Sequence, residues 1–222
     1  MDINHLDIPN LGKIPVKIEN NPFRLLAINI INGCDNFNDA KELFANSYLN
    51  QKARQTLGIL YDIPNSNIAH LPADTIFFPW IHQKPVNYKR FNESHFFSIF
   101  SNESCLKKHY NRIKKLVYSI KEYGYVPDKF PTRQGGICGH FLAHGDNKNF
   151  FVSAGNHRVA VLSALYPDKK IPVIFEEKSF FKPRDLENRG PILDIYSSDN
   201  VNNWPAVKNN FLKKEDALKM FG

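Results

Sequence analysis

The sequence predicts an α/β (α+β) protein, in which helices surround a small mixed sheet, and three observations carry this prediction. Apolar residues recur every three or four positions from Leu106 to Tyr123, which predicts a long amphipathic helix ended by Gly124. Residues 136–153 contain two apolar runs joined by a Gly-Asp-Asn-Lys turn, as in a hairpin. A glycine turn, a short helix over 159–166 and a strand over 171–175 follow.

The N-terminal part carries weaker signals. Residues 1–35 indicate a loop-rich segment with short strands at Ile14–Ile18 and Leu25–Ile31. Asn38-Asp39 offers a helix cap, and apolar residues continue at helical spacing until Gly58. Residues 60–92 are rich in proline, asparagine and aromatic side chains, so we expect irregular structure that pins its aromatics inward.

A length of 222 residues suits one domain with extensions. We expect an N-terminal extension over 1–92 that packs on the core, a core over 93–178, and a C-terminal tail over 179–222. The tail contains Trp204-Pro205, which we interpret as a hydrophobic anchor, and a terminal helix near 213–221.

The composition excludes several classes of protein. A hydrophobic fraction of 42% with 23% charged residues excludes wholesale disorder. No apolar run approaches the roughly 18 residues that span a bilayer, and the first residues lack the layout of a signal peptide. The three cysteines are an odd number without a C-x-x-C pair, which fits a reducing compartment. We therefore expect a cytoplasmic protein with no membrane span.

The charge favours an anionic partner. Twenty-nine basic against 22 acidic residues give a formal charge of +7. No block of five like charges is present, so the chain lacks a basic tail of the kind that binds nucleic acid, and nucleic acid is a possible but not favoured partner. A nucleotide with a small-molecule substrate is the favoured partner. The basic face of the helix over 106–123 is open to two interpretations, a solvated surface or a contact with nucleic acid.

The chemistry concentrates at Gly155-Asn156-His157-Arg158, between a strand and the first turn of a helix. A helix start presents unpaired N–H groups and the positive end of the backbone dipole. Gly155 lets an anion approach the backbone, and Asn156 is a natural cap. His157 and Arg158 add donors, and a guanidinium suits phosphate. This turn therefore predicts a phosphate site, with an ordinary strand-to-helix turn as the alternative.

Three motifs in this order resemble the ParB/sulfiredoxin superfamily of ParB-like nucleotide-binding proteins. They are the helix end Ser119-Ile120 with Gly124, the turn Gly155-Asn156-His157-Arg158, and the closing Ile171-Pro172-Val173. The resemblance implies a ParB/sulfiredoxin-like core and a nucleotide bound by residues 155–158. This nucleotide would be ATP, ADP or CTP with Mg. Sulfiredoxins place a cysteine after the glycine, where this chain has Asn156, so thiolate attack is not expected.

The free-serine kinase branch of this superfamily is most similar, because its turn reads G-H-H-R. That likeness implies a phosphotransferase acting on a small hydroxylated metabolite. His157 and Arg158 would then act in catalysis, and a carboxylate before the long helix, Glu93 or Glu103, would be the general base. The alternative is a ParB-like regulatory protein that binds nucleotide or nucleic acid without catalysis. Little room remains for a helix-turn-helix domain after Phe175.

The flanking segments resemble uncharacterised ParB-like proteins of bacterial surface-polysaccharide biosynthesis. The residues that carry this likeness are Leu71-Pro72-Ala73-Asp74, Phe78-Pro79-Trp80, Trp204-Pro205-Ala206-Val207-Lys208 and Glu215-Asp216-Ala217-Leu218. The likeness implies a sugar-like substrate and does not identify the reaction.

Metal ligands are a minor alternative. His140 and His144 would face the same side of a strand, with Asp146 nearby, and Asp194 and Asp199 form a second acidic pair. We expect the histidines to be satisfied by neighbouring side chains and the acids to be solvated, so no metal site is predicted.

Overall fold

The computed structural model describes residues 6–7, 18–47, 79–83, 103–127, 136–144, 147–175, 193 and 195–221. Within these ranges, helices surround a five-stranded sheet that has both parallel and antiparallel pairs, which confirms the predicted fold class. The helices are α1 (Pro22–Ile31), α2 (Phe37–Ala45), α5 (Glu103–Tyr123), α6 (Asn156–Leu165), α8 (Pro205–Lys208) and α9 (Lys214–Phe221). The strands are β1 (Leu6–Asp7), β2 (Cys138–His144), β3 (Asn147–Ala154), β4 (Ile174–Phe175) and β5 (Ile195–Ser197), and η2 (Ile18–Asn20) and η6 (Ser198–Asn203) are 3-10 turns.

The predicted hairpin forms the centre of the sheet. Strands β2 and β3 pair antiparallel from Cys138↔Ala154 to His144↔Asn147. Strand β1 adds to β3 in parallel. Strands β4 and β5 both pair in parallel with β2, on the side of β2 opposite β3. Strand β4 pairs with the first residues of β2, and β5 pairs with later residues of β2.

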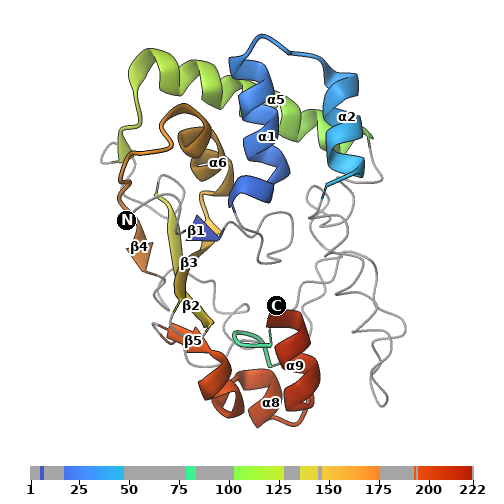
Figure 1. Cartoon of the computed structure of the whole chain (residues 1–222), viewed down its shortest axis with the longest axis vertical. Coiled ribbons are helices and arrows are strands. Elements are labelled where there is room, and N and C mark those ends of the chain that lie inside the picture. The colour runs from blue at the N-terminus through green and yellow to red at the C-terminus, as the bar shows by residue number, and fades with distance from the viewer. Residues whose placement is uncertain are drawn as a thin grey trace.

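Helices α1, α2, α5 and α6 gather on one side of the sheet (Figure 1), and together with the sheet they form a first apolar cluster. Alternate residues of β3, Phe150 and Val152, point into this cluster, as expected for a strand whose side chains alternate between faces. Helix α5 contributes Leu106, Ile113 and Val117 at spacings of seven and four residues, which places them on one side of the helix. The predicted amphipathic helix is therefore confirmed, and Gly124 ends it with a φ of +74°.

The other face of the sheet has a second apolar cluster, built with η6, α8 and α9. Phe151 of β3 belongs to this second cluster, although the residues before and after it in the sequence, Phe150 and Val152, belong to the first. Trp80 and Trp204 are buried in it, with ring centroids 5.9 Å apart. Trp204 also donates from Nε1 to Asn200 Oδ1 at 2.8 Å, so it anchors this segment as predicted.

The predicted strand at Leu25–Ile31 is wrong, because these residues belong to helix α1. The run of leucine and isoleucine suggests a strand, but Asn21 caps a helix by accepting from the amide of Phe23 at 2.9 Å. Pro22 then occupies the first turn, where its missing N–H has no cost. The buried residues Phe23, Leu26 and Ile30 are at helical spacing, and their burial favours the helix over a strand.

Other boundaries also differ from the predictions. Asn36, and not Asn38-Asp39, caps α2, and Asn36 Oδ1 accepts from the amide of Asn38 at 2.9 Å. Helix α2 ends at Ala45, and the predicted continuation from residue 48 lies outside the described residues. The strand expected over 171–175 is reduced to β4, and Ile171 is instead buried in the first cluster. Ile18 opens η2, and the rest of the strand expected at Ile14–Ile18 lies outside the described residues.

The helices of the described ranges are each too short or too polar to cross a bilayer.

Candidate functional site

Gly155 makes the turn that starts α6. Its φ is +90°, a left-handed conformation that side chains disfavour. A Cβ at this position would lie 2.8 Å from the carbonyl oxygen of Gly136 and 3.0 Å from the Cα of Ile137. The turn is therefore pressed against the chain that leads into β2, and only glycine fits both the backbone angle and the space.

The first turn of α6 has no side-chain cap. Its first intrahelical bond runs from the amide of Val159 to the carbonyl of Gly155 at 3.0 Å. The amides of Asn156 and His157 precede this bond and have no acceptor within the helix. They lie at the positive end of the helix dipole, which favours an anion.

Asn156 is not the cap of α6, which corrects the prediction. The helix begins at Asn156 itself, three residues before the expected start at Val159, and Gly155 occupies the cap position. The side chain of Asn156 makes no capping bond to the helix amides, and its buried Oδ1 has no hydrogen-bond partner among the described residues. A buried acceptor of this kind is costly unless a donor reaches it.

Arg158 lies beside the same turn and is half-buried. Its Nη1 donates to the carbonyl oxygen of Gly136 at 3.1 Å, so the guanidinium spans the space between α6 and the start of β2. Burial lowers the pKa of Arg158, and the positive charge of Arg112 on α5 lowers it further. The like charge of Arg112 therefore opposes that of Arg158, and a bound anion would relieve this repulsion.

His157 packs inward among three helices. Its Nε2 lies 2.9 Å from Nδ1 of His109 on α5, and the two rings are within 14° of parallel. Phe23 of α1 covers both rings, with centroids at 4.6 Å from His157 and 5.5 Å from His109. One histidine donates and the other accepts, so Nε2 of His157 is occupied by a protein partner.

Both histidines are neutral at neutral pH. Burial lowers the pKa of His109 to about 4, with Arg112 and Lys108 adding to the effect. Burial, His109 and Arg112 lower the pKa of His157 well below its ordinary value. Burial is the main cause of this neutrality, and the nearby positive charges, which add to it, also disfavour a divalent metal ion between the rings.

His109 is a residue that sequence reasoning missed. The signal was available, because His109 lies three residues after Leu106 and four before Ile113, on the buried side of the helix. A histidine at an inward position of an amphipathic helix needs a polar partner. The sequence alone does not say that this partner comes from residue 157.

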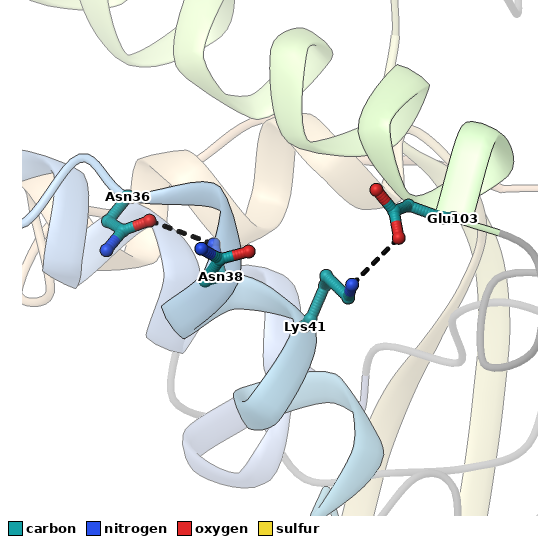
Figure 2. A network of polar contacts seen from close by, with 4 residues as sticks. All are labelled: Asn36, Asn38, Lys41 and Glu103. Atoms are coloured by element: carbon teal, nitrogen blue, oxygen red, sulfur yellow. Dashed lines mark hydrogen bonds and ion pairs between the residues drawn. The ribbon is translucent and has the colours of Figure 1, made fainter.

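No described contact places either predicted base, Glu93 or Glu103, at the turn that starts α6. Glu103 is exposed at the start of α5, and its Oε2 accepts from Lys41 Nζ of α2 at 2.7 Å (Figure 2). The hydrogen bond from Lys41 lowers the pKa of Glu103, which weakens it as a base. Glu93 lies outside the described residues.

The minor metal candidates have other partners or are not described. His140 is buried, stacks on Phe151, and accepts at Nε2 from Nε1 of Trp80 at 3.3 Å. Asp199 is exposed in η6. The side chain of His144, Asp146 and Asp194 lie outside the described residues. No group of three potential metal ligands occurs in the part of the chain that the structure describes.

No family model matches the sequence, and neither a curated protein nor a solved structure matches the chain. The ParB/sulfiredoxin-like assignment therefore stays a prediction from the motifs. The arrangement of the described residues at the start of α6 nevertheless has a clear chemical character. It combines backbone amides, a half-buried guanidinium and a second arginine, which together suit an anion with more than one negative charge.

Proposed function

We propose that the chain binds the phosphates of a nucleotide at the start of α6 and transfers a phosphoryl group to a small hydroxylated metabolite. The observation that carries the proposal is the uncapped turn at Gly155, with Arg158 held beside it by the carbonyl of Gly136. The type of reaction is inferred from the resemblance of the motifs, and the geometry of the turn at Gly155 supports the binding step.

The binding step follows from the shape and charge of the turn. The Cβ position of Gly155 faces the Gly136 carbonyl, so the binding step depends on the amides of Asn156 and His157, which have no acceptor within the helix and can donate to a phosphate oxygen. Arg158 and Arg112 offset the charge of a polyphosphate better than that of a single phosphate. The orphaned Oδ1 of Asn156 requires a donor, which a hydroxyl group of the nucleotide or of the acceptor supplies.

The transfer step is an in-line displacement at the terminal phosphorus. The acceptor hydroxyl oxygen forms the new P–O bond, the bond to the leaving nucleotide phosphate breaks, and the hydroxyl proton passes to a carboxylate. We assign this carboxylate to Glu93, because Lys41 holds Glu103. The described residues of the turn supply N–H donors and one amide oxygen, that of Asn156, but no carboxylate, so they fit phosphate better than Mg²⁺, which would arrive bound to the nucleotide.

His157 takes a different role from the one predicted. Because Nε2 of His157 is hydrogen-bonded to Nδ1 of His109, we assign His157 to positioning the first turn of α6. That atom does not contact the transferred phosphate. The catalytic assignment is thereby reduced to Arg158 and the proposed base, Glu93.

The test of binding is a thermal-shift panel of ATP, ADP and CTP with Mg²⁺, because a ligand of the folded state raises its apparent stability. We expect at least one of these nucleotides to raise the melting temperature of the native chain. Arg158→Ala is expected to lower the affinity for that nucleotide by about 10- to 100-fold, since it removes charge-assisted hydrogen bonds. Lys208→Ala, which removes an exposed cation on α8, is the control and should leave affinity unchanged.

Unchanged affinity in Arg158→Ala, or an equal loss in Lys208→Ala, would contradict the binding proposal. Turnover with hydroxylated acceptors then tests transfer: Glu93→Gln is expected to abolish transfer and keep nucleotide affinity. Nucleotide binding with no turnover would favour the second candidate, a regulatory protein of the ParB-like kind that binds nucleotide or nucleic acid without catalysis. The observation in favour of this candidate is that Glu103, one of the two predicted bases, is held by Lys41.

A further inference from the structure

Helix α5 presents a stripe of basic and aromatic side chains to the outside of the molecule. Its inner side packs in the first cluster, and the helix crosses one end of the structure with its opposite side uncovered by the other described helices (Figure 1). The exposed stripe consists of Lys108, Arg112, Lys115, Tyr118 and Lys121. Successive members are three or four residues apart, so each is the surface neighbour of the next.

The cations of the stripe have no ion-pair partner within the described ranges, in contrast to two nearby cations, Lys41 and Lys114. Lys41 is bonded to Glu103, and Lys114 is bonded to Asp35. Glu122, near the end of the helix, shares a hydrogen bond with Tyr123. The acids beside the stripe thus have other partners, and its cations present their charge to the solvent.

Tyr118 gives the stripe a second property. Tyr118 is 52% exposed, so its aromatic ring is available on the surface of the helix. It lies one helical turn beyond Lys115, with Lys121 on its other side. Near the end of the helix, Tyr123 is also 70% exposed.

We propose that this stripe binds single-stranded nucleic acid. The lysines and the arginine would neutralise successive phosphates, and Tyr118 would stack on an unpaired base. A duplex hides its base faces, so it does not use an aromatic ring in this way. An anionic membrane is a poorer fit, because the exposed stripe contains no aliphatic side chain for insertion. Arg112 and Lys108 border the His109–His157 pair beside the nucleotide turn, the other members of the stripe lie further along α5, and the proposed binding does not depend on phosphotransfer.

The test is the affinity of the full chain for a fluorescent oligothymidylate of about 12 nucleotides, a length typical of single-strand binding sites, measured by anisotropy at several salt concentrations. We expect Lys108→Gln/Lys115→Gln to lower the affinity and to reduce the salt slope by about 1.4, since each neutralised phosphate of a single strand contributes about 0.7. The matched control, Lys213→Gln/Lys214→Gln, removes the same charge from exposed positions near α9 and should keep both values. Both pairs leave Arg112 and Arg158 in place, so nucleotide binding is tested separately.

Tyr118→Ala is expected to lower affinity by about fivefold or more without changing the salt slope, because it removes stacking and no charge. Equal effects of the two lysine pairs, an unchanged affinity in Tyr118→Ala, or equal affinity for a duplex of the same sequence would overturn the proposal. Binding only to vesicles that contain phosphatidylserine would also overturn it.

Discussion

Gly155 is the residue on which the geometry of the candidate site depends most directly. It needs a positive φ and it also needs an empty Cβ position, because the Gly136 carbonyl is only 2.8 Å from where a Cβ would lie. Gly124 has a similar positive φ but nothing within 4 Å of its Cβ position. The two glycines therefore separate the backbone effect from the steric effect.

We predict that Gly155→Ala destabilises the protein more than Gly124→Ala. Strain from the positive φ alone costs about 1 kcal/mol and applies to both variants. Gly155→Ala adds a clash with backbone atoms, which do not move aside as a flexible side chain does, so its total cost should exceed about 2 kcal/mol. The free energy of unfolding in urea measures both values, and equal losses would contradict the close packing of the turn.

At the residue scale, the sequence predicted the position of the turn better than the role of each side chain. Gly155 and Arg158 lie where the motif places them, since glycine and arginine at a strand-to-helix junction have few alternatives. Asn156 was misassigned because a capping propensity is local, and here Gly155 takes the cap. The partners of His157 could not be predicted, because Phe23 and His109 come from segments 134 and 48 residues away in the chain.

At the scale of elements, the His109–His157 pair joins α5 to α6, and Phe23 of α1 closes over it. The charged groups that face the pair are Arg112 and Lys108 on α5 and Arg158 on α6, and all of them oppose protonation. The junction of these helices is therefore sensitive to acid.

We predict that stability falls as the pH is lowered from about 6.5 to about 4. The pKa of His109 is about 4 in the folded chain, against 6.5 for a histidine free in water, so the unfolded chain binds more protons in this window. The expected loss is about 1 kcal/mol for each pH unit. His109→Gln should flatten the dependence, measured by urea unfolding at several pH values, while Lys115→Gln on the exposed side should retain it. An unchanged slope in His109→Gln would contradict the neutral pair.

Elements were predictable where one periodicity dominated. Helix α5 has buried residues at clear helical spacing, and the β2–β3 hairpin has two apolar runs around a turn. Helix α1 was missed because most of its residues are apolar, so that periodicity is hidden and β-branched isoleucines favour a strand. Its true signal was the Asn21-Pro22 start.

At the scale of the whole molecule, the sheet divides the apolar residues into two clusters that share β2 and β3. Both tryptophans of the chain, Trp80 and Trp204, belong to the second cluster, whereas the longest described helices belong to the first. Tryptophan fluorescence and helical circular dichroism therefore report mainly on opposite faces of the sheet.

We predict that the two clusters unfold together. Val161→Ala removes two methyl groups from a fully buried position of the first cluster and should cost about 2 kcal/mol. Because Phe150 and Phe151 of one strand point into different clusters, this loss should shift the fluorescence and dichroism transitions in urea by the same amount. A shift of the dichroism transition alone would show that the two clusters unfold independently.

The order of the elements along the chain has a consequence for synthesis on the ribosome. Helix α1 packs against α5 and α6, and strand β1 pairs with β3, so the earliest segments complete their packing with segments that are made more than 70 residues later. Apart from the part that α2 covers, the apolar side of α1 accordingly waits without its native cover until residue 165 has left the exit tunnel. A nascent chain with such a face exposed is a natural client for chaperones that shield apolar helices during translation.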